Sequence, residues 1–424
     1  MRILVLNYEY PPIGGGGAPA SREIARGYVQ KGHVVHVVSA RFGELPFEEL
    51  VDGMRVYRLP CLPSRKELSH PREHLSFVVA AMRFLRRHLK YHAYDVCHAH
   101  FLLPTGLVAL YLRRQFGLPY LITAHGSDIP GYNVDRFKLL HRFTPPLLRR
   151  ICDSAVQIVA PSDYVIGLLG DNIQRYPEGK VIKIPNGIDL DQFVPLRKEN
   201  IILATGRFLP RKGFQHLIRA VSDVDLGFEV HICGDGPMRA QLQQLAARSR
   251  TRIIFHGWVD ASSFSYRQLL ASASIFVLPS TCENASISLL EGMSAGCAMV
   301  TSNVSGCPET VAACGVLIDP TDTAALTTTL IALTRDSGLR ERLQTSARQR
   351  VAQVFAWDRI AQAYEHRLLS AIGGTPQQTG AASTAAGDPE SMRPLAHLTG
   401  LPSDGGPSAA PDGAPPGATP ATDA

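Results

Sequence analysis

Several features that would place this chain in a particular class are missing from its sequence. No stretch approaches about 18 consecutive apolar residues, so no helix is expected to span a membrane. The opening apolar run breaks at Asn7, which is too short for a secretory signal and is typical of a buried first strand. The eight cysteines form no C-x-x-C pair, which favours buried free thiols in a reducing compartment over disulfides or zinc ligands.

The length and the charge of the chain predict its organisation. Because one domain usually spans about 100 to 200 residues, 424 residues predict two domains with accessory segments. From residue 373 onward Gly, Pro, Ala, Ser and Thr dominate, so residues 373–424 are predicted to form a disordered tail. This tail holds one Arg and five acidic residues, which leaves 42 basic and 32 acidic residues in the body. The body therefore carries a net charge of +10, against +6 for the whole chain.

Short β-rich apolar runs alternate with segments of helical period along the body. The expected strands are residues 3–6, 34–38, 95–98, 120–123 and 158–159, followed by 201–204, 229–233, 252–256, 275–278 and 299–301. This alternation is typical of right-handed βαβ units and predicts an α/β fold with two parallel sheets.

A Gly-containing turn at residues 185–189 precedes a polar connection that contains proline, and this predicts a domain boundary near residue 190. The expected domains are residues 1–190 and 191–372, with the tail beyond them. The helix-rich segment 337–369 closes the second domain, and packing back on the first domain is an open alternative.

In open α/β sheets, ligands bind beyond the carboxyl ends of the strands, and two such places stand out in the first domain. The first strand leads into four glycines, including Gly15 and Gly16, whose backbone N–H groups can approach a phosphate at the start of a helix. The fourth strand leads to His125 and Asp128, which suit hydrogen bonds to ligand hydroxyls or a catalytic polar role. The alternatives are a flexible turn and a structural histidine at a strand end.

The second domain opens with a strand followed by the segment Gly-Arg-Phe-Leu-Pro-Arg-Lys-Gly at residues 206–213. Arg207, as a planar fork, and Lys212, as a point charge, can straddle a pyrophosphate. A solvated basic loop is the alternative. The next strand ends in the turn Gly-Asp-Gly-Pro at residues 234–237, which we expect to be structural.

Two carboxylates eight positions apart, Glu283 and Glu291, lie between a strand and a helix. Eight residues of ideal helix rise by about 12 Å, which suits the two ends of one nucleotide sugar. With Glu291 two turns inside the helix, its carboxylate would accept ribose hydroxyls, while the N–H groups of residues 286–288, which include Ser286 and Ile287, face a diphosphate. The alternative is a capping role for Glu283 and a structural pair for Glu291.

Residues 77–90 predict an amphipathic, basic helix. Its apolar positions are Val78, Met82, Leu85 and Leu89, and its basic positions are Arg83, Arg86, Arg87 and Lys90. A second basic cluster spans residues 136–150. Both clusters suit a peripheral hold on an anionic membrane, although solvated helix faces carry such charges routinely. No stacking aromatics are interleaved with the basic residues, so nucleic acid is not expected as a partner.

Taken together, these motifs resemble those of the retaining GT-B glycosyltransferases of family four, over about residues 1–370. The hallmark glutamate pair of that family is present as Glu283 and Glu291, and its G-R-x-x-x-x-K-G signature as residues 206–213. The glycine loop, His125, the turn at 186–189 and the turn at 234–237 are in register as well. The resemblance implies two Rossmann-like doubly wound domains that face each other across a cleft. Two departures are Ser274, where the family often has Asp, and the sequence Ser-Gly-Cys-Pro-Glu at 305–309.

The resemblance also implies roles for individual residues. Arg207 and Lys212 bind the donor diphosphate and offset the charge of the leaving group, Gly15 and Gly16 line the phosphates, and Glu291 binds the ribose. Glu283 binds sugar hydroxyls near the reacting carbon, and His125 binds the sugar or the transition state. The catalytic set is thus His125, Arg207, Lys212 and Glu283, with Asp128, Arg83, Arg86 and Arg87 as candidates on the acceptor side.

The expected reaction moves a hexose-type sugar from a nucleotide-diphosphate sugar to a glycan or lipid-linked acceptor of a cell-surface polysaccharide or glycolipid. A UDP-sugar is favoured as the donor, with a GDP-sugar as the alternative. Like the family that it resembles, the enzyme is expected to need no metal and no cofactor, since no D-x-D pair follows a strand where Mg²⁺ would be needed. It is expected to be cytoplasmic, with a possible peripheral contact with the membrane. The alternatives are a non-catalytic partner that binds nucleotide sugars and an epimerase of the same fold.

Overall fold

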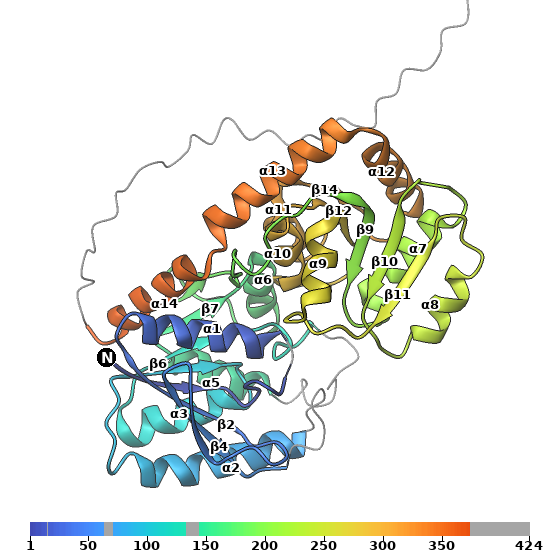
Figure 1. The fold of residues 1–424 in the computed structure, drawn as a ribbon. Helices are drawn as coiled ribbons and strands as arrows, with labels where there is room; N and C mark the ends of the chain where they lie inside the picture. Colours follow the sequence, from blue (N-terminus) through green and yellow to red (C-terminus); the bar gives the residue numbers. More distant parts are fainter. Residues whose placement is uncertain (15, 63–70, 133–143, 374–424) are drawn as a thin grey trace, which may run out of the picture. The chain divides into compact units, whose positions relative to one another are not determined.

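A computed structural model describes residues 1–14, 16–62, 71–132 and 144–373 (Figure 1). All but the far end of the chain belongs to one compact unit, Met1–Ala381. Gly15, most of the basic cluster at 136–150, and the predicted tail beyond residue 373 lie outside the described residues.

Eight strands form the first sheet in the order β3-β4-β2-β1-β5-β6-β7-β8. Their bounds are β1 Arg2–Leu6, β2 Val34–Ala40, β3 Glu48–Val51, β4 Met54–Leu59, β5 Val96–His100, β6 Tyr120–Thr123, β7 Gln157–Ala160 and β8 Val181–Lys183. All neighbours pair in parallel except β3 and β4, which are antiparallel. The sheet is therefore parallel except for β3, an additional strand at its edge that the sequence did not predict. Asp52 and Gly53 both have positive φ and make the two-residue turn of a hairpin, for which Asp-Gly is a strong signal.

The second sheet has six strands in the order β11-β10-β9-β12-β13-β14, all parallel. Their bounds are β9 Glu199–Thr205, β10 Glu229–Cys233, β11 Ile253–Gly257, β12 Ala273–Leu278, β13 Ala298–Ser302 and β14 Gly315–Ile318. Every strand that the sequence predicted is present, and β14 is added at the edge. The fold is α/β with two parallel-sheet domains, as predicted.

Helices cover both faces of each sheet (Figure 1). Those of the first half are α1 Gly17–Gln30, α2 Pro71–His88, α3 Thr105–Phe116, α5 Pro145–Ser154 and α6 Asp163–Asn172. Those of the second half are α7 Phe214–Ser222, α8 Arg239–Ala246, α9 Phe264–Ser272, α10 Ile287–Ser294, α11 Cys307–Val311, α12 Thr323–Arg335, α13 Ser337–Val354 and α14 Trp357–Ala371, with short 3-10 helices η1 Pro210–Lys212 and η2 Ala312–Cys314.

The last helix, α14, returns to the first sheet and lies beside α1 (Figure 1). Tyr364 and Leu368 share a buried cluster with Ile24 of α1 and with the first strand. At Gly27 the two helices approach so closely that a Cβ would lie 2.4 Å from the Cβ of Ala361. The segment that the sequence left open is therefore divided: α14 packs on the first sheet, whereas α13 packs against α10 and β13 of the second domain.

No helix of the described residues is long and apolar enough to cross a membrane. All eight cysteines are free thiols, and all but Cys61 and Cys282 are buried. The buried free thiols agree with what the composition led us to expect.

Candidate active site

Glycines bring the carboxyl ends of three neighbouring strands of the second sheet into direct contact. The N–H of Gly234, after β10, donates to the carbonyl of Gly257 at the end of β11, with an N···O distance of 2.7 Å. A Cβ on Gly234 would lie 1.9 Å from the carbonyl oxygen of Gly206, after β9, so no larger residue fits there. The turn at 234–237 is thus a packing element, as expected, and it fixes the backbone from which Arg207 projects.

Lys212, at the end of η1, reaches across to the loop that follows β12. Its Nζ lies 2.5 Å from Oε1 of Glu283, and the two side chains are only 17% and 8% exposed. Gly213 makes this approach possible, because its φ is +73° and a Cβ would lie 1.9 Å from the carbonyl oxygen of Pro279. The N–H of Thr281 also donates to the carbonyl of Arg211, at 2.8 Å. Lys212 and a buried carboxylate are therefore held together at the edge of the sheet on which the backbone of Arg207 also lies.

Helix α10 begins at Ile287, with Ser286 as its N-cap, as the sequence predicted. Glu291 is the fifth residue of the helix and therefore lies about one turn inside it, whereas we expected two turns. The reason is that residues 279–286 form a loop, so the rise of an ideal helix does not apply to the whole interval between the glutamates.

Glu291 is buried beneath the start of α10. Its Oε2 accepts a hydrogen bond of 2.8 Å from the hydroxyl of Tyr266 on α9. Burial raises the pKa of Glu291 to about 7, although the bond from Tyr266 acts in the opposite direction. The carboxyl group can thus be protonated or ionised near neutral pH, and a ligand that donates hydrogen bonds would favour the ionised form.

His125 follows β6 and lies under the start of α1. A Cβ on Gly17 would lie 3.3 Å from Cγ of His125, and a Cβ on Gly16 would lie 3.8 Å from Cδ1 of Ile287. Nε2 of His125 lies 3.1 Å from Nδ1 of His100, and burial lowers the pKa of His125 to about 4. The glycine loop therefore lies between a neutral histidine of the first sheet and the N-terminus of α10 from the second.

Asn284, directly after Glu283, was missed by the sequence reasoning. Its Nδ2 donates to the backbone carbonyl of His125 at 2.8 Å, and its Oδ1 accepts from the hydroxyl of Ser162 at 2.6 Å. A Cβ on Gly306 would lie 1.9 Å from the carbonyl oxygen of Asn284, so this segment is tightly enclosed. The only signal in the sequence was the place of an amide between the two glutamates, because its partners are more than a hundred residues away.

The acceptor-side candidates lie in two separate places. The carboxylate of Asp128 accepts from the N–H of Leu102 at 2.5 Å, and burial raises its pKa to about 6. Arg83, Arg86 and Arg87 project from the exposed face of α2. Asp128 ties its turn to the segment before α3, and the role of all four residues toward an acceptor stays a prediction.

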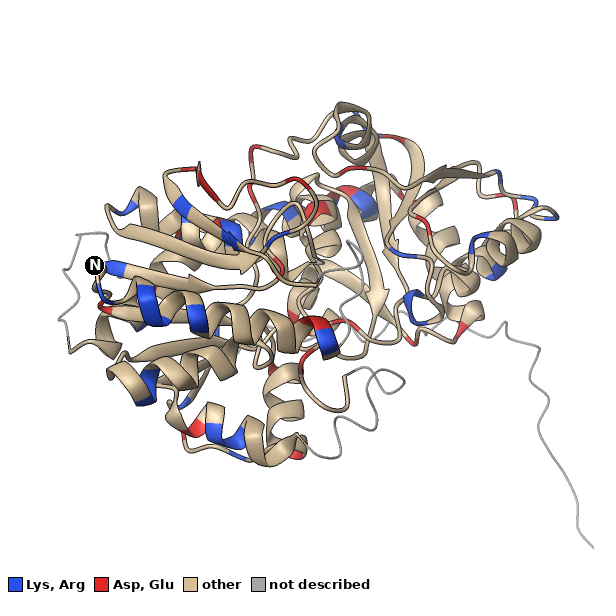
Figure 2. Cartoon of the chain, turned by 90° about the horizontal axis from the view of Figure 1, so that it is seen from below, with Lys and Arg blue, Asp and Glu red and all other residues tan. Residues whose placement is uncertain are grey.

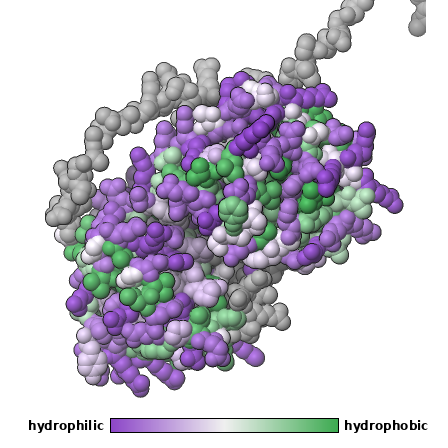
Figure 3. Space-filling model, viewed as in Figure 1, coloured by the Kyte–Doolittle hydropathy of each residue, from purple (hydrophilic) through white to green (hydrophobic). Residues whose placement is uncertain are grey.

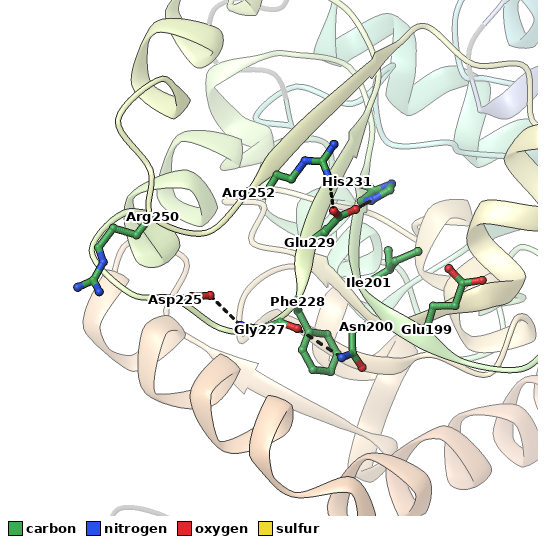
Figure 4. Close-up of a pocket in the computed structure, with 10 residues that line it drawn as sticks. All are labelled: Glu199, Asn200, Ile201, Asp225, Gly227, Phe228, Glu229, His231, Arg250 and Arg252. Atoms are coloured by element: carbon green, nitrogen blue, oxygen red, sulfur yellow. Dashed lines mark hydrogen bonds and ion pairs between the residues drawn. The ribbon is translucent and has the colours of Figure 1, made fainter.

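A pocket of about 480 Å³ opens at the other edge of the second sheet, where β9 and β10 begin (Figure 4). Glu229 lies there between Arg252, at 2.5 Å, and His231, at 3.1 Å. No predicted site residue lines this pocket, and it lies away from the glycine-bounded edge that carries Arg207 and Lys212. Within the described ranges, no group of three or more His, Cys, Asp or Glu residues could hold a metal ion. The expectation of a metal-free reaction stays a prediction.

Solved structures of glycosyltransferases share this two-sheet architecture. Sucrose-phosphate synthase of Thermosynechococcus elongatus superposes with a TM-score of 0.74 at 21% identity, over 88% of this chain and 100% of that one. HepE of Anabaena, solved in complex with UDP, gives a TM-score of 0.70 at 18% identity, over 87% and 100% of the two chains. These likenesses show that the fold is the GT-B fold.

Sequence comparison identifies the family. Residues 14–192 match the family described as Glycosyltransferase Family 4, and residues 199–336 match Glycosyl transferases group 1. An uncharacterized glycosyltransferase of Methanocaldococcus jannaschii is 29% identical over 392 residues, which cover 85% of this chain and 96% of that protein. The chain belongs to the group 1 glycosyltransferases of family four, as its motifs predicted, and it is a transferase enzyme.

Proposed function

We propose that this enzyme moves a hexose-type sugar from a nucleotide-diphosphate sugar, with retention at the anomeric carbon, to a glycan or lipid-linked acceptor of a cell-surface polysaccharide or glycolipid. The observation that carries the proposal is the buried contact between Lys212 and Glu283 beside the N-terminus of α10. One sheet edge thus carries a cation, a carboxylate and the backbone N–H groups at the start of a helix. The cation and the N–H groups match the diphosphate of such a donor, and the carboxylate matches its sugar hydroxyls.

In the proposed complex the donor diphosphate lies between the cationic pair and the start of α10. Lys212 and Arg207 offset the charge that develops on the leaving phosphate, which is the group that needs most stabilisation in the transition state. When Lys212 turns to the phosphate, Glu283 is released to accept hydrogen bonds from sugar hydroxyls. The same carboxylate thus holds the lysine in the free enzyme and the sugar in the complex.

At the other end of the donor, the ionised carboxylate of Glu291 accepts the two ribose hydroxyls. Tyr266 keeps that carboxylate in place by its hydrogen bond of 2.8 Å. In the reaction itself, the bond from the anomeric carbon to the leaving phosphate oxygen breaks, and a bond to the acceptor oxygen forms on the same face. The departing phosphate oxygen takes the proton of the acceptor hydroxyl, so no protein base is required.

The nature of the donor is supported by fold relatives, since HepE was solved in complex with UDP. We therefore favour a UDP-sugar over a GDP-sugar. We also propose that residues 191–372 carry the donor site and residues 1–190 the acceptor site, with Asp128 on the acceptor side and His125 beside the reacting carbon.

The test is to incubate the full chain with a panel of UDP- and GDP-sugars without added metal, and to follow hydrolysis or transfer together with the anomeric configuration of the product. Lys212→Ala and Glu291→Ala are each expected to lower turnover by about a hundredfold or more. Lys90→Ala, at an exposed position just after α2, is the matched control and should retain wild-type turnover. Wild-type turnover in both site variants would refute the site assignment.

The alternative of a non-catalytic partner predicts a different result in the same assay. Such a protein would bind a nucleotide sugar, in a manner that depends on Lys212 and Glu291, but would release no product with any donor of the panel. An epimerase would instead convert the donor into its isomer without releasing the nucleotide.

A peripheral contact with an anionic membrane is proposed for α2. Its arginines are exposed, together with Leu75 (62%) and Val79 (38%), whereas Val78 and Leu85 are buried in the core. On the face seen in Figure 3, apolar residues are scattered among hydrophilic ones. Lys and Arg occur on many elements (Figure 2). Electrostatic attraction to anionic lipids would therefore carry such a contact.

Liposome flotation tests the membrane contact. We expect binding to vesicles of phosphatidylserine and phosphatidylcholine that is lost in high salt, and that weakens when Arg83, Arg86 and Arg87 are all replaced by Gln. Vesicles of phosphatidylcholine alone are the control. Equal binding by wild type and by the triple variant would contradict the role of α2.

A further inference from the structure

A continuous chain of polar side chains runs through the first lobe and ends at His125. It begins under α1 and α14, where His98 of β5 lies between the hydroxyl of Tyr28 (3.0 Å from Nδ1) and that of Thr123 (2.8 Å from Nε2). Two residues further along β5, the ring of His100 lies 4.1 Å from that of His98 and contacts His125. Neither histidine of β5 was singled out by the sequence, and the proposed reaction leaves both without a role.

The tautomer of His98 follows from its partners. Thr123 donates its hydroxyl proton to the hydroxyl of Tyr364, at 3.3 Å, so the oxygen of Thr123 must accept from Nε2–H of His98. Nδ1 of His98 then accepts from the hydroxyl of Tyr28. Both ring nitrogens of His98 therefore have a hydrogen-bond partner.

In His100, by contrast, only one of the two ring nitrogens has a hydrogen-bond partner among the described residues. Nδ1 of His100 lies 3.1 Å from Nε2 of His125, whereas Nε2 of His100 is buried and has no hydrogen-bond partner among the described residues. Burial lowers the pKa of both rings, so each is neutral and carries one N–H at neutral pH. One of the two facing nitrogens must be the donor and the other the acceptor.

The unpartnered nitrogen decides between the two arrangements. If His125 donated, the proton of His100 would sit on its buried Nε2, and a donor would be left without an acceptor. If His100 donates from Nδ1, only a lone pair is left without a partner, and orphaned buried N–H groups are the rarer and costlier case. His100 is therefore the donor, and Nε2 of His125 is the acceptor.

The proton of His125 is then on Nδ1, on the side of the ring that faces the start of α1. A Cβ placed on Gly17 would lie 3.4 Å from this nitrogen, next to the glycine loop and across from Ile287 of α10. Among the described residues, Nδ1 of His125 has no hydrogen-bond partner, and it is not fully buried. It is thus an N–H donor directed toward the place proposed for the donor sugar and its phosphates.

We propose that His100 is a positioning residue, which holds His125 in the Nδ1–H tautomer so that His125 donates a hydrogen bond to the donor sugar or to its departing phosphate. This inference rests on the proposed function for the identity of the ligand, but the tautomer is a property of the free protein. The buried ring of His100 acts only through His125 and does not touch the substrate.

The first test is nitrogen NMR of the full chain labelled with ¹⁵N-histidine, with the His125 signals assigned by their loss in His125→Gln. The wild type should show Nδ1 of His125 as the protonated nitrogen and Nε2 as the unprotonated one. In His100→Leu the donor is gone, and His125 should shift toward the Nε2–H form that free imidazole favours. His100→Asn, whose amide can donate from nearly the same position, should restore the Nδ1–H form. A wild-type His125 protonated on Nε2 would overturn the proposal, whether or not the variants fold.

The second test uses turnover of UDP-glucose as the probe. His100→Leu should lower kcat by about 10- to 100-fold, by analogy with the range seen when a group that orients a metal-binding histidine is lost. KM should change by less than about twofold, and His100→Asn should recover most of the rate. An unchanged kcat in His100→Leu, in an active enzyme, would refute the functional half of the proposal. If the wild type turns over no nucleotide sugar, the proposed function fails, and the NMR measurement still decides the tautomer.

Discussion

Replacing Lys212 by Met tests whether the ion pair at the sheet edge is as isolated from solvent as the structure indicates. The side chain of Glu283 is 8% exposed and lies 2.5 Å from Nζ of Lys212. Losing the lysine leaves a carboxylate that has little access to water and has lost the cation in contact with it. Removing one partner of a buried pair typically costs about 3 to 5 kcal/mol. Because Lys212 is itself 17% exposed, and water can enter from its side, we expect the lower end, about 3 kcal/mol.

The double variant Lys212→Met, Glu283→Gln separates the unpaired charge from the loss of packing. A buried amide needs far less solvation than a carboxylate. The free energy of unfolding of the double variant should therefore be only about 1.5 kcal/mol below that of the wild type. Together with Glu283→Gln alone, it closes a double-mutant cycle whose expected coupling energy is about 2 to 3 kcal/mol. Lys90→Met, on the surface, is the matched control and should change the stability by less than about 0.5 kcal/mol.

The assay is equilibrium unfolding in urea, followed by circular dichroism and by tryptophan fluorescence, with the m-values compared among the four chains. The free energy of unfolding of Lys212→Met could lie within about 0.5 kcal/mol of the wild-type value, or the effects of the two single changes on it could simply add. Either result would show that the pair is not buried in the way described. The cycle also bears on catalysis. A loss of turnover in Lys212→Ala can reflect a destabilised loop, so turnover is measured where the unfolding curve shows the variant to be fully folded, and a loss under those conditions reflects the missing cation.

Two further predictions concern neighbouring residues. Because the pKa of Glu291 is raised to about 7 and ribose hydroxyls would donate to its ionised form, affinity for UDP-glucose should rise by about tenfold from pH 6 to pH 8 and fall as the carboxyl is protonated. Calorimetry should find this slope in the wild type and none in Glu291→Gln; a flat wild-type profile would contradict the ribose contact. Gly213→Ala should lower the free energy of unfolding by about 3 kcal/mol or more, because the new Cβ adds a clash with Pro279 to the strain of a positive φ. Gly43→Ala, with a positive φ but open space, should cost only about 1 kcal/mol, and equal shifts in thermal midpoint would show that the clash is absent.

Local patterns in the sequence were sufficient for most strands of both sheets and for the family. Apolar runs of the right length mark the strands inside both sheets, since burial on both faces demands them, except for β4, in which Arg55 and Arg58 interrupt the run. The elements that were missed lie at or beside sheet edges, where β3, β8 and β14 are short and partly exposed and give only a weak apolar signal. The hairpin of β3 and β4 nevertheless carried a readable signal in Asp52-Gly53.

Part of the candidate site could likewise be predicted from the sequence, and part of it could not. Arg207, Lys212, Glu283 and the N-terminus of α10 could be named from the sequence, because each directly follows a strand and the carboxyl ends of parallel strands meet at one edge. The ion pair between Lys212 and Glu283, the single helical turn before Glu291 and the contact of Glu291 with Tyr266 depend on how loops fold back over that edge. None of these contacts is visible in the spacing of the residues.

The contacts around His125 belong to the tertiary structure alone. Asn284 bonds to the backbone of His125 from 159 positions away, and His100 meets its ring only because β5 and β6 are neighbours in the sheet. The sequence by itself determined which residue types stand at the ends of the strands, since local propensity and burial act along the chain. The partner of each side chain, and with it the protonation of His125 and Glu291, was decided by packing between segments that are distant in sequence.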